Sequence, residues 1–150
     1  MKRLFQIAAL GALLTICLGG CSKKNDNKPS SSAASSWSFA GTTYSAGTTV
    51  FTNNALLSIA KANSQETLTI QFSSRPSSGT YTVVAANPNN KQCVIQGTSL
   101  GGNSALLSQG GGSVNISDDN GKIQASFSNV PMVTVASASA GNLTGNLTEQ

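Results

Sequence analysis

Cys21 is the residue whose surroundings predict the most definite chemistry. It ends the segment Leu18-Gly19-Gly20-Cys21, which follows a basic start (Lys2, Arg3) and an apolar run from Leu4 to Leu18. This order is typical of a secretory signal that ends in a lipobox, since the two glycines let the chain lie extended in a peptidase groove. The cysteine thiol is the nucleophile to which a diacylglyceryl group can be attached. We therefore predict that residues 1–20 are a lipoprotein signal peptide and that Cys21 is the acylated first residue of the mature chain.

Two other interpretations of this segment are open. A transmembrane helix needs about 20 apolar residues to cross about 30 Å of hydrocarbon, whereas Leu4 to Leu18 offers fifteen and Lys23 and Lys24 follow soon after. The second alternative is a soluble secreted protein that is cleaved nearby. The acylated form predicts a durable membrane anchor, because each buried methylene contributes roughly 0.8 kcal/mol and two or three acyl chains act together.

Much catalytic chemistry is excluded by residues and motifs that the sequence lacks. It contains no histidine, which removes Ser-His-Asp and Cys-His hydrolases, His-ligated zinc and the usual proton shuttle at neutral pH. It contains neither G-x-x-x-x-G-K nor G-x-G-x-x-G, and we expect no helix after the glycines at 110–112 that could hold a phosphate. We therefore expect no cofactor and no metal site.

The cysteines predict no intramolecular disulfide. Cys17 would leave with the signal and Cys21 would be acylated, so only Cys93 remains. Cys93 lies in the strand-like run 92–95, and we expect a buried structural thiol there. A reactive thiol and an intermolecular bridge are the alternatives.

Four carboxylates are available for acid-only catalysis in the predicted domain: Glu66, Asp118, Asp119 and Glu149. A hydrolase of this kind needs two of them within roughly 5–10 Å of each other in a cleft. The segment 118–121 is Asp-Asp-Asn-Gly, and Asp-Asn-Gly between alternating apolar runs predicts a hairpin turn. A calcium loop is disfavoured, because it would need oxygens at alternate positions and a closing Glu.

Three aromatic residues are candidates for ligand binding. Trp37, Tyr44 and Tyr81 could stack on sugar rings or on a peptide, together with a loop predicted at 97–112. Aromatic residues on alternating strands more often belong to the core. Both roles are open at this point.

The net charge of +4 comes from outside the predicted domain. Lys2 and Arg3 belong to the signal, and three lysines and one aspartate lie between residues 22 and 36. From residue 37 onward, four basic residues balance four acidic ones. The domain is therefore neutral and has no basic face for phosphates, so we expect no nucleic-acid partner.

Two kinds of segment must position these residues. Residues 21–36 are predicted to be the acylated cysteine and a flexible tether, because this Lys-, Asn- and Ser-rich stretch has nothing to bury. Residues 37–150 are predicted to form one domain, in which apolar residues alternate with Ser, Thr and Asn, most clearly at 67–72. About eight to ten short strands, with turns every 8–12 residues, predict an all-β, antiparallel β-sandwich. An up-and-down β-barrel is the alternative.

The same pattern gives five local predictions. These are two separate strands around Ala46-Gly47, a hairpin of 57–60 with 67–72, a hairpin of 80–86 with 92–96, an irregular stretch from Gly97 to Gly112, and a hairpin of 113–117 with 122–128 that Pro131 closes.

Three strand motifs, together with the lipobox and a Trp soon after the tether, resemble those of a protein family. They are Ser78-Gly79-Thr80-Tyr81, Gly112-Ser113-Val114-Asn115-Ile116-Ser117 and Gly121-Lys122-Ile123-Gln124-Ala125-Ser126-Phe127-Ser128. The sequence resembles small lipoproteins of unknown function from Bacteroidetes-type bacteria, which share G-T-Y, G-x-V-x-I-S and I-x-G-x-F strands. Ala125 stands where that pattern has glycine. The resemblance implies no activity. Residues 22–26 are similar to the export tags that mark surface-displayed proteins of that group but have one acidic residue where two are usual, so the resemblance leaves both the cell surface and the periplasmic side open. The absence of Asp at position 22 is similar to outer-membrane sorting.

Together these observations predict a lipoprotein anchored in the outer membrane, facing either the cell surface or the periplasm. Its predicted role is that of a non-catalytic binding or structural module of the cell envelope. A glycan- or small-ligand-binding β-sandwich is the alternative, and an acid-only hydrolase is a lesser one. The expected partners are the membrane, through the lipid anchor, and an envelope protein or a glycan.

Overall fold

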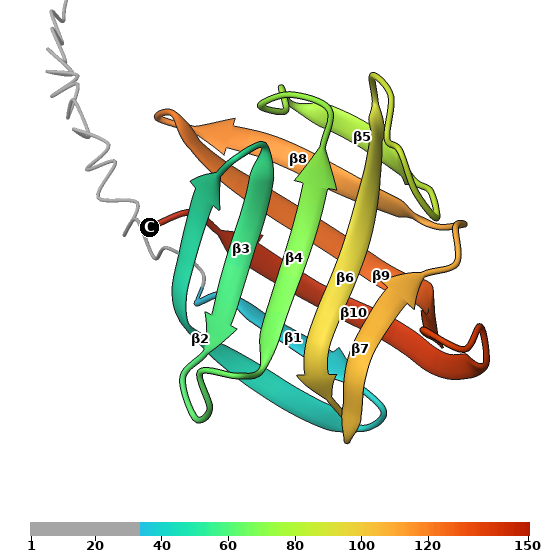
Figure 1. Cartoon of the computed structure of the whole chain (residues 1–150). Coiled ribbons are helices and arrows are strands. Elements are labelled where there is room, and N and C mark those ends of the chain that lie inside the picture. The colour runs from blue at the N-terminus through green and yellow to red at the C-terminus, as the bar shows by residue number, and fades with distance from the viewer. Residues whose placement is uncertain (1–33) are drawn as a thin grey trace, which may run out of the picture. The chain divides into compact units, whose positions relative to one another are not determined.

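The described part of the chain consists almost wholly of β-strands and the turns between them (Figure 1). The computed structural model describes residues 34–150, so the predicted signal peptide, Cys21 and most of the predicted tether lie outside the described residues. Residues 34–150 contain no helix, and the all-β prediction is confirmed. The strands are β1 (Ser36–Phe39), β2 (Thr42–Thr52), β3 (Ala55–Ala60), β4 (Thr67–Phe72), β5 (Gly79–Val83), β6 (Gln92–Leu100), β7 (Asn103–Ser108), β8 (Ser113–Asp119), β9 (Lys122–Thr134) and β10 (Ser139–Thr148).

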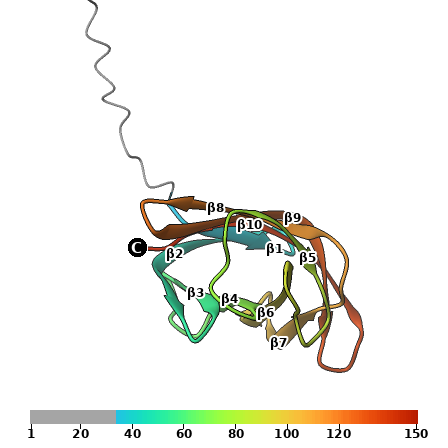
Figure 2. The same ribbon diagram turned by 90° about the horizontal axis from the view of Figure 1, so that it is seen from above.

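The strands pack as two layers that cross at a steep angle (Figures 1 and 2). One layer contains β1, β8, β10 and the first half of β9, and the other contains β3, β4, β6 and β7. Hydrogen bonding runs from β10 through β1, β2, β3, β4, β6, β7 and β9 back to β10, with β5 and β8 inserted between β6 and β9. The domain therefore combines the two packed layers of a sandwich with the closed hydrogen bonding of a barrel.

Two long strands carry the chain from one layer to the other. β2 pairs first with β1 and then with β3, and its register shifts at Gly47. β9 pairs first with β8 and then with β7, and Asn129 (φ 54°) marks a bulge opposite Thr144. A bulge bends a strand and increases its twist, which lets one strand serve both layers. The predictions of two separate strands around Gly47 and of a strand end at Pro131 are therefore wrong, because β2 and β9 each continue through these positions.

Two-residue turns connect four of the hairpins. Both residues of each turn have φ between 48° and 81° in Ala40-Gly41, Asn53-Asn54, Gly101-Gly102 and Asn120-Gly121. This geometry is favoured because its twist matches that of the flanking strands. The predicted turn at 118–121 is confirmed. The predicted irregular stretch from Gly97 to Gly112 is wrong, since Gly101-Gly102 is a tight turn between β6 and β7 and only 109–112 is left as a loop.

The pairing of β5 differs from the predicted hairpin with β6. β5 pairs antiparallel with β8 but parallel with β6, so the domain is not purely antiparallel. β5 covers only the start of one edge of β6, and β7 covers the end of the same edge. The buried hydroxyl of Ser108, at the end of β7, connects β6 to the residue that follows β5. It accepts from the Ile95 N–H (3.2 Å) and donates to the Val84 carbonyl (2.9 Å).

Apolar side chains fill the space between the layers. The larger buried residues are Trp37, Phe39, Tyr44, Leu56, Leu68, Ile70, Phe72, Tyr81, Ile95, Leu100, Leu106, Ile116, Ile123, Phe127, Met132, Leu143 and Leu147. The hairpin of β3 with β4 is confirmed, and it supplies Leu56, Leu68 and Ile70 to this core. The alternation of apolar and polar residues thus places one side of each strand inside and leaves the other side facing outward.

Candidate functional site

The predicted lipidation site, Cys21, lies outside the described residues. The structure does show that the domain includes residues before Trp37. The hydroxyl of buried Ser35 donates to the Thr148 carbonyl (3.2 Å) and accepts from the Thr148 N–H (2.7 Å). Ser35 is therefore part of the domain, two residues before the predicted boundary at Trp37.

The three aromatic residues predicted as ligand contacts are core residues. Trp37, Tyr44 and Tyr81 are only 1%, 6% and 5% exposed. Trp37 stacks on Tyr44 with 5.7 Å between ring centroids, and the Tyr44 hydroxyl accepts from the Gly101 N–H (2.9 Å). The alternation that forms their strands also points these rings inward, where they cannot stack on a ligand. The prediction that they bind a ligand is wrong, and so is the form of the glycan hypothesis that used them with a loop at 97–112.

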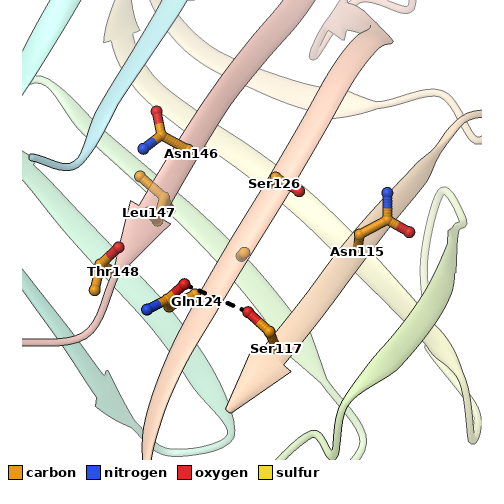
Figure 3. Close-up of a pocket in the computed structure, with 8 residues that line it drawn as sticks. Asn115, Ser117, Gln124, Ser126, Asn146, Leu147 and Thr148 are labelled. Atoms are coloured by element: carbon orange, nitrogen blue, oxygen red, sulfur yellow. Dashed lines mark hydrogen bonds between the residues drawn. The ribbon is translucent and has the colours of Figure 1, made fainter. Parts of the chain in front are cut away.

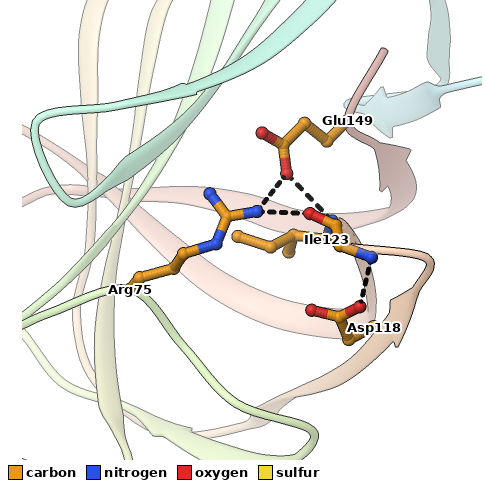
Figure 4. A network of polar contacts seen from close by, with 5 residues as sticks. Arg75, Asp118, Ile123 and Glu149 are labelled. Atoms are coloured by element: carbon orange, nitrogen blue, oxygen red, sulfur yellow. Dashed lines mark hydrogen bonds and ion pairs between the residues drawn. The ribbon is translucent and has the colours of Figure 1, made fainter.

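Two of the acidic residues proposed for hydrolysis hold the end of the chain to a hairpin turn (Figure 4). One oxygen of Glu149 accepts from Arg75 (Nη2 to Oε2, 2.8 Å) and from the Ile123 N–H (3.0 Å). Arg75 also donates to the Gly121 carbonyl (2.6 Å), and Asp118 accepts from the Gly121 N–H (2.8 Å). These contacts bind the loop after β4, the β8–β9 turn and the chain end to one another.

The remaining acidic residues lie outside this network. Asp119 accepts from the side-chain amide of Asn120 (2.9 Å) in the β8–β9 turn, and Glu66 lies in the connection between β3 and β4. Among residues 34–150, no group of three or more His, Cys, Asp or Glu side chains is placed to hold a metal ion. This arrangement gives the acid-only hydrolase no support.

Cys93 lies on β6 with its side chain in the core and is 0% exposed. Burial raises the pKa of its thiol to about 12, because the apolar surroundings disfavour the thiolate. The thiolate is the reactive form of cysteine. The prediction of a buried structural thiol is therefore confirmed.

One outward face of the domain consists mainly of hydroxyl and amide side chains. It extends over β1, β8, β10 and the first half of β9, with one residue of β2 and one of β5 at its two ends. We call it the polar face and define it as Ser36, Ser38, Ser45, Thr80, Asn115, Ser117, Gln124, Ser126, Thr144 and Asn146. The nearest charged residues along these strands, Asp119 and Lys122, flank the β8–β9 turn. They lie opposite each other and on the same side of the strands as Ser117 and Gln124, so one pair of opposite charges borders the polar face.

Strand register aligns this face in rows. One row crosses six strands from β5 to β2 in the order Thr80, Asn115, Ser126, Asn146, Ser36 and Ser45. Neighbouring strands are about 4.8 Å apart, so the row is about 24 Å long. A row of this length could contact several units of an extended ligand.

Three hydroxyl–amide pairs organise the polar face. In each pair the two residues lie directly opposite on neighbouring strands: Thr80 Oγ1 donates to Asn115 Oδ1 (2.9 Å), Ser117 Oγ to Gln124 Oε1 (3.4 Å) and Ser36 Oγ to Asn146 Oδ1 (3.3 Å). A primary amide has an acceptor oxygen and a nitrogen with two donor hydrogens. The hydroxyl holds one end of each amide, and the other end has no protein partner among residues 34–150.

A hollow of about 100 Å³ lies on the polar face over β8, β9 and β10 (Figure 3). It is lined by Asn115, Ser117, Gln124, Ala125, Ser126, Asn146, Leu147 and Thr148. Pockets for drug-sized molecules are about 300–1,000 Å³. The hollow is thus suited to one protruding group of a larger ligand.

Comparisons with protein-family models, with curated proteins and with solved structures find no match to this chain. Of the elements in residues 34–150, none is a helix with the length and apolar character needed to cross a membrane. The functional interpretation therefore depends on the residues of the chain itself.

The polar face was not among the sites predicted from sequence. Its residues occupy the polar half of the same alternation that predicted the strands, as Asn115 and Ser117 do beside Val114 and Ile116. The one available signal is that Lys and Glu, which are common on solvated surfaces, are missing from these outward positions. The pairing of hydroxyls with amides depends on strand register, which the sequence pattern does not specify.

Proposed function

We propose that this chain is a non-catalytic binding module of the cell envelope, anchored in the outer membrane through acylated Cys21. The observation that carries the proposal is the segment Leu18-Gly19-Gly20-Cys21 at the end of an apolar run that is too short to span a bilayer. The polar face is the candidate surface for its ligand. The module would face either the cell surface or the periplasm.

The arrangement of reactive groups supports a binding role over a catalytic one. The Cys93 thiol is buried and its pKa is raised to about 12. Glu149 and Asp118 are acceptors in bonds that hold the chain end and a turn. The space between the layers is filled with apolar side chains, so a ligand would bind on the outside of the domain, where the polar face offers neutral hydroxyls and amides.

Metabolic labelling with an alkyne analogue of palmitate tests the anchor. The full chain expressed in a Gram-negative host should take up the label and partition into the detergent phase. Cys21→Ser should lose both properties, because serine has no thiol to receive the lipid. Cys17→Ser is the matched control, since it changes the neighbouring cysteine of the same apolar segment and should leave labelling intact.

Two results would contradict the anchor. One is a Cys21→Ser chain that keeps the label, and the other is a wild-type chain that is exported without any label. A mass spectrum of the mature N-terminus would identify the acylated residue in either case.

A further inference from the structure

The polar face offers hydrogen-bonding groups that the domain does not itself use. Asn115, Gln124 and Asn146 each have one end of the amide held by a hydroxyl across the strand pair and the other end without a partner among residues 34–150. Holding one end reduces the number of orientations that each side chain can adopt. Less conformational entropy is then lost when a ligand binds.

The composition of this face excludes several classes of ligand. Its ten residues are uncharged, and the Asp119–Lys122 pair that borders them has no net charge, so the face does not attract phosphates, nucleic acids or charged peptides. It has no exposed aliphatic or aromatic group for a lipid or an apolar helix. Each of the ten strands also has two hydrogen-bonded neighbours, so the sheet has no full-length open edge to which an extended peptide could add as a further strand. A ligand that matches the face must be neutral and rich in its own hydroxyl groups.

We propose that the polar face binds a neutral glycan, with the free amide ends of Asn115, Gln124 and Asn146 contacting sugar hydroxyls. This inference rests on the proposed function as a binding module and names its ligand class. The six-strand row of about 24 Å matches an extended polymer, and the hollow lined by Gln124 and Asn146 accepts one protruding group.

The affinity of a single domain for such a ligand is weak. The polar face has no aromatic ring on which a sugar could stack, and one neutral hydrogen bond changes affinity by only about 2- to 10-fold. Copies held on one membrane would bind a polymer together, because the first contact raises the effective concentration for the next ones. The experiment should therefore display many copies of the chain.

Co-sedimentation of vesicles provides this test. The full, acylated chain is reconstituted in phosphatidylcholine vesicles and mixed with insoluble cellulose, curdlan or mannan, with protein-free vesicles as background. The test variant is Gln124→Ala/Asn146→Ala on the polar face. The matched control is Gln71→Ala/Gln96→Ala, which removes two outward amides from the other layer of the domain. Thermal unfolding checks that both variants remain folded.

We expect wild-type vesicles to sediment with at least one of the three neutral polysaccharides. Apparent affinity should fall about 10-fold or more in the polar-face variant and remain unchanged in the control. Sedimentation with none of the three, an unaffected polar-face variant, or an equal loss in the control would overturn the proposal. Stronger binding to pectate or to beads that carry a Ser-Gly peptide would also overturn it, in favour of a charged glycan or of a protein partner.

The outcome is separable from that of the anchor experiment. A chain that is labelled with palmitate but sediments with no neutral polysaccharide overturns the glycan proposal alone. A chain that is not labelled can be captured on nickel-chelating vesicles through an added C-terminal tag. Sedimentation of those vesicles would then support glycan binding while the lipid anchor fails.

Discussion

The polar face and the outward face of the other layer lie on the same closed sheet but present different side chains. We call the second surface the mixed face and define it as Val50, Leu57, Ile59, Thr67, Thr69, Gln71, Gln96, Thr98, Ala105, Leu107 and Val133. One of its rows crosses six strands in the order Val50, Leu57, Thr69, Gln96, Leu107 and Val133. Aliphatic residues therefore stand at both ends of this row, whereas the corresponding row of the polar face has none.

This comparison separates what the fold requires from what it leaves free. Both faces cover a core of buried apolar residues, so the need to fill the interior does not explain their difference. On the mixed face, outward aliphatic residues such as Leu57 and Leu107 are only partly exposed and stabilise strand pairing through contacts with their neighbours. On the polar face, hydroxyl–amide bonds connect the outward residues. The outward positions are therefore the part of this domain in which function can be encoded.

The largest expected effect concerns two inward glycines, one in each layer. A Cβ on Gly145, in the polar-face layer, would lie 2.7 Å from the Ser36 carbonyl oxygen and 2.8 Å from the Trp37 Cβ. A Cβ on Gly97, in the mixed-face layer, would lie 2.6 Å from the end of the Leu100 side chain, which can rotate away. Gly145→Ala should therefore lower the free energy of unfolding by about 3 kcal/mol and Gly97→Ala by about 1 kcal/mol.

Urea denaturation of the two glycine variants measures this difference. Equal losses would show that the β1–β10 contact can relax as easily as a side chain can. A larger loss for Gly97→Ala would reverse the expected order of rigidity between the two layers.

The next effect concerns pH and involves Cys93, which is buried beneath the mixed face. Burial raises the pKa of Cys93 from 9.0 to about 12, so above pH 9 the unfolded chain loses a proton that the folded chain keeps. This contribution to stability is complete below pH 9 and is lost as the pH rises toward 12. At pH 10.5 the free energy of unfolding should have fallen by about 2 kcal/mol through this group.

Cys93→Ala provides the control for the alkaline decrease. The difference in unfolding free energy between pH 8 and pH 10.5 should be smaller in this variant than in the wild type. An unchanged difference would mean that other groups cause the alkaline loss.

The smallest effects are expected for two serines, one buried and one on the polar face. Ser108→Ala removes the hydroxyl that bonds Ile95 and Val84, which should lower the free energy of unfolding by about 2 kcal/mol because buried polar groups lose a partner. Ser126→Ala, on the polar face, should change it by less than about 0.5 kcal/mol. Thermal or urea unfolding measures both. A large loss from Ser126→Ala would mean that the polar face stabilises the fold, which would weaken its assignment as a binding surface.

Much of the fold follows from local sequence. The alternation in 67–72 predicts which side chains of β4 point inward, and Asn120-Gly121 predicts a tight turn, because both signals depend only on neighbouring residues. The lipobox is predicted for the same reason. The tight turn at Gly101-Gly102 was not predicted, since a pair of glycines is compatible with a loop as well as with a two-residue turn.

The features that local sequence did not predict depend on strands that are distant in the chain. The parallel pairing of β5 with β6 is determined by the antiparallel pairing of β5 with β8, which lies about 30 residues further on. The inward direction of Trp37 and Tyr81 requires knowledge of which side of each strand faces the other layer. The polar face likewise depends on register, because Ser36 meets Asn146 only after the two ends of the domain pair.

The closed circuit of strands has a consequence if the chain is anchored in a membrane as proposed and is present there at high density. Anchored neighbours diffuse in a plane and collide often, and an open strand on one copy would serve as a template for another. Within residues 34–150, every strand has two hydrogen-bonded neighbours, and only short stretches such as 79–81 of β5 keep one unpaired edge. Crowded copies of this domain would therefore meet mainly through side chains, because no full-length open strand is present from which a shared sheet could grow.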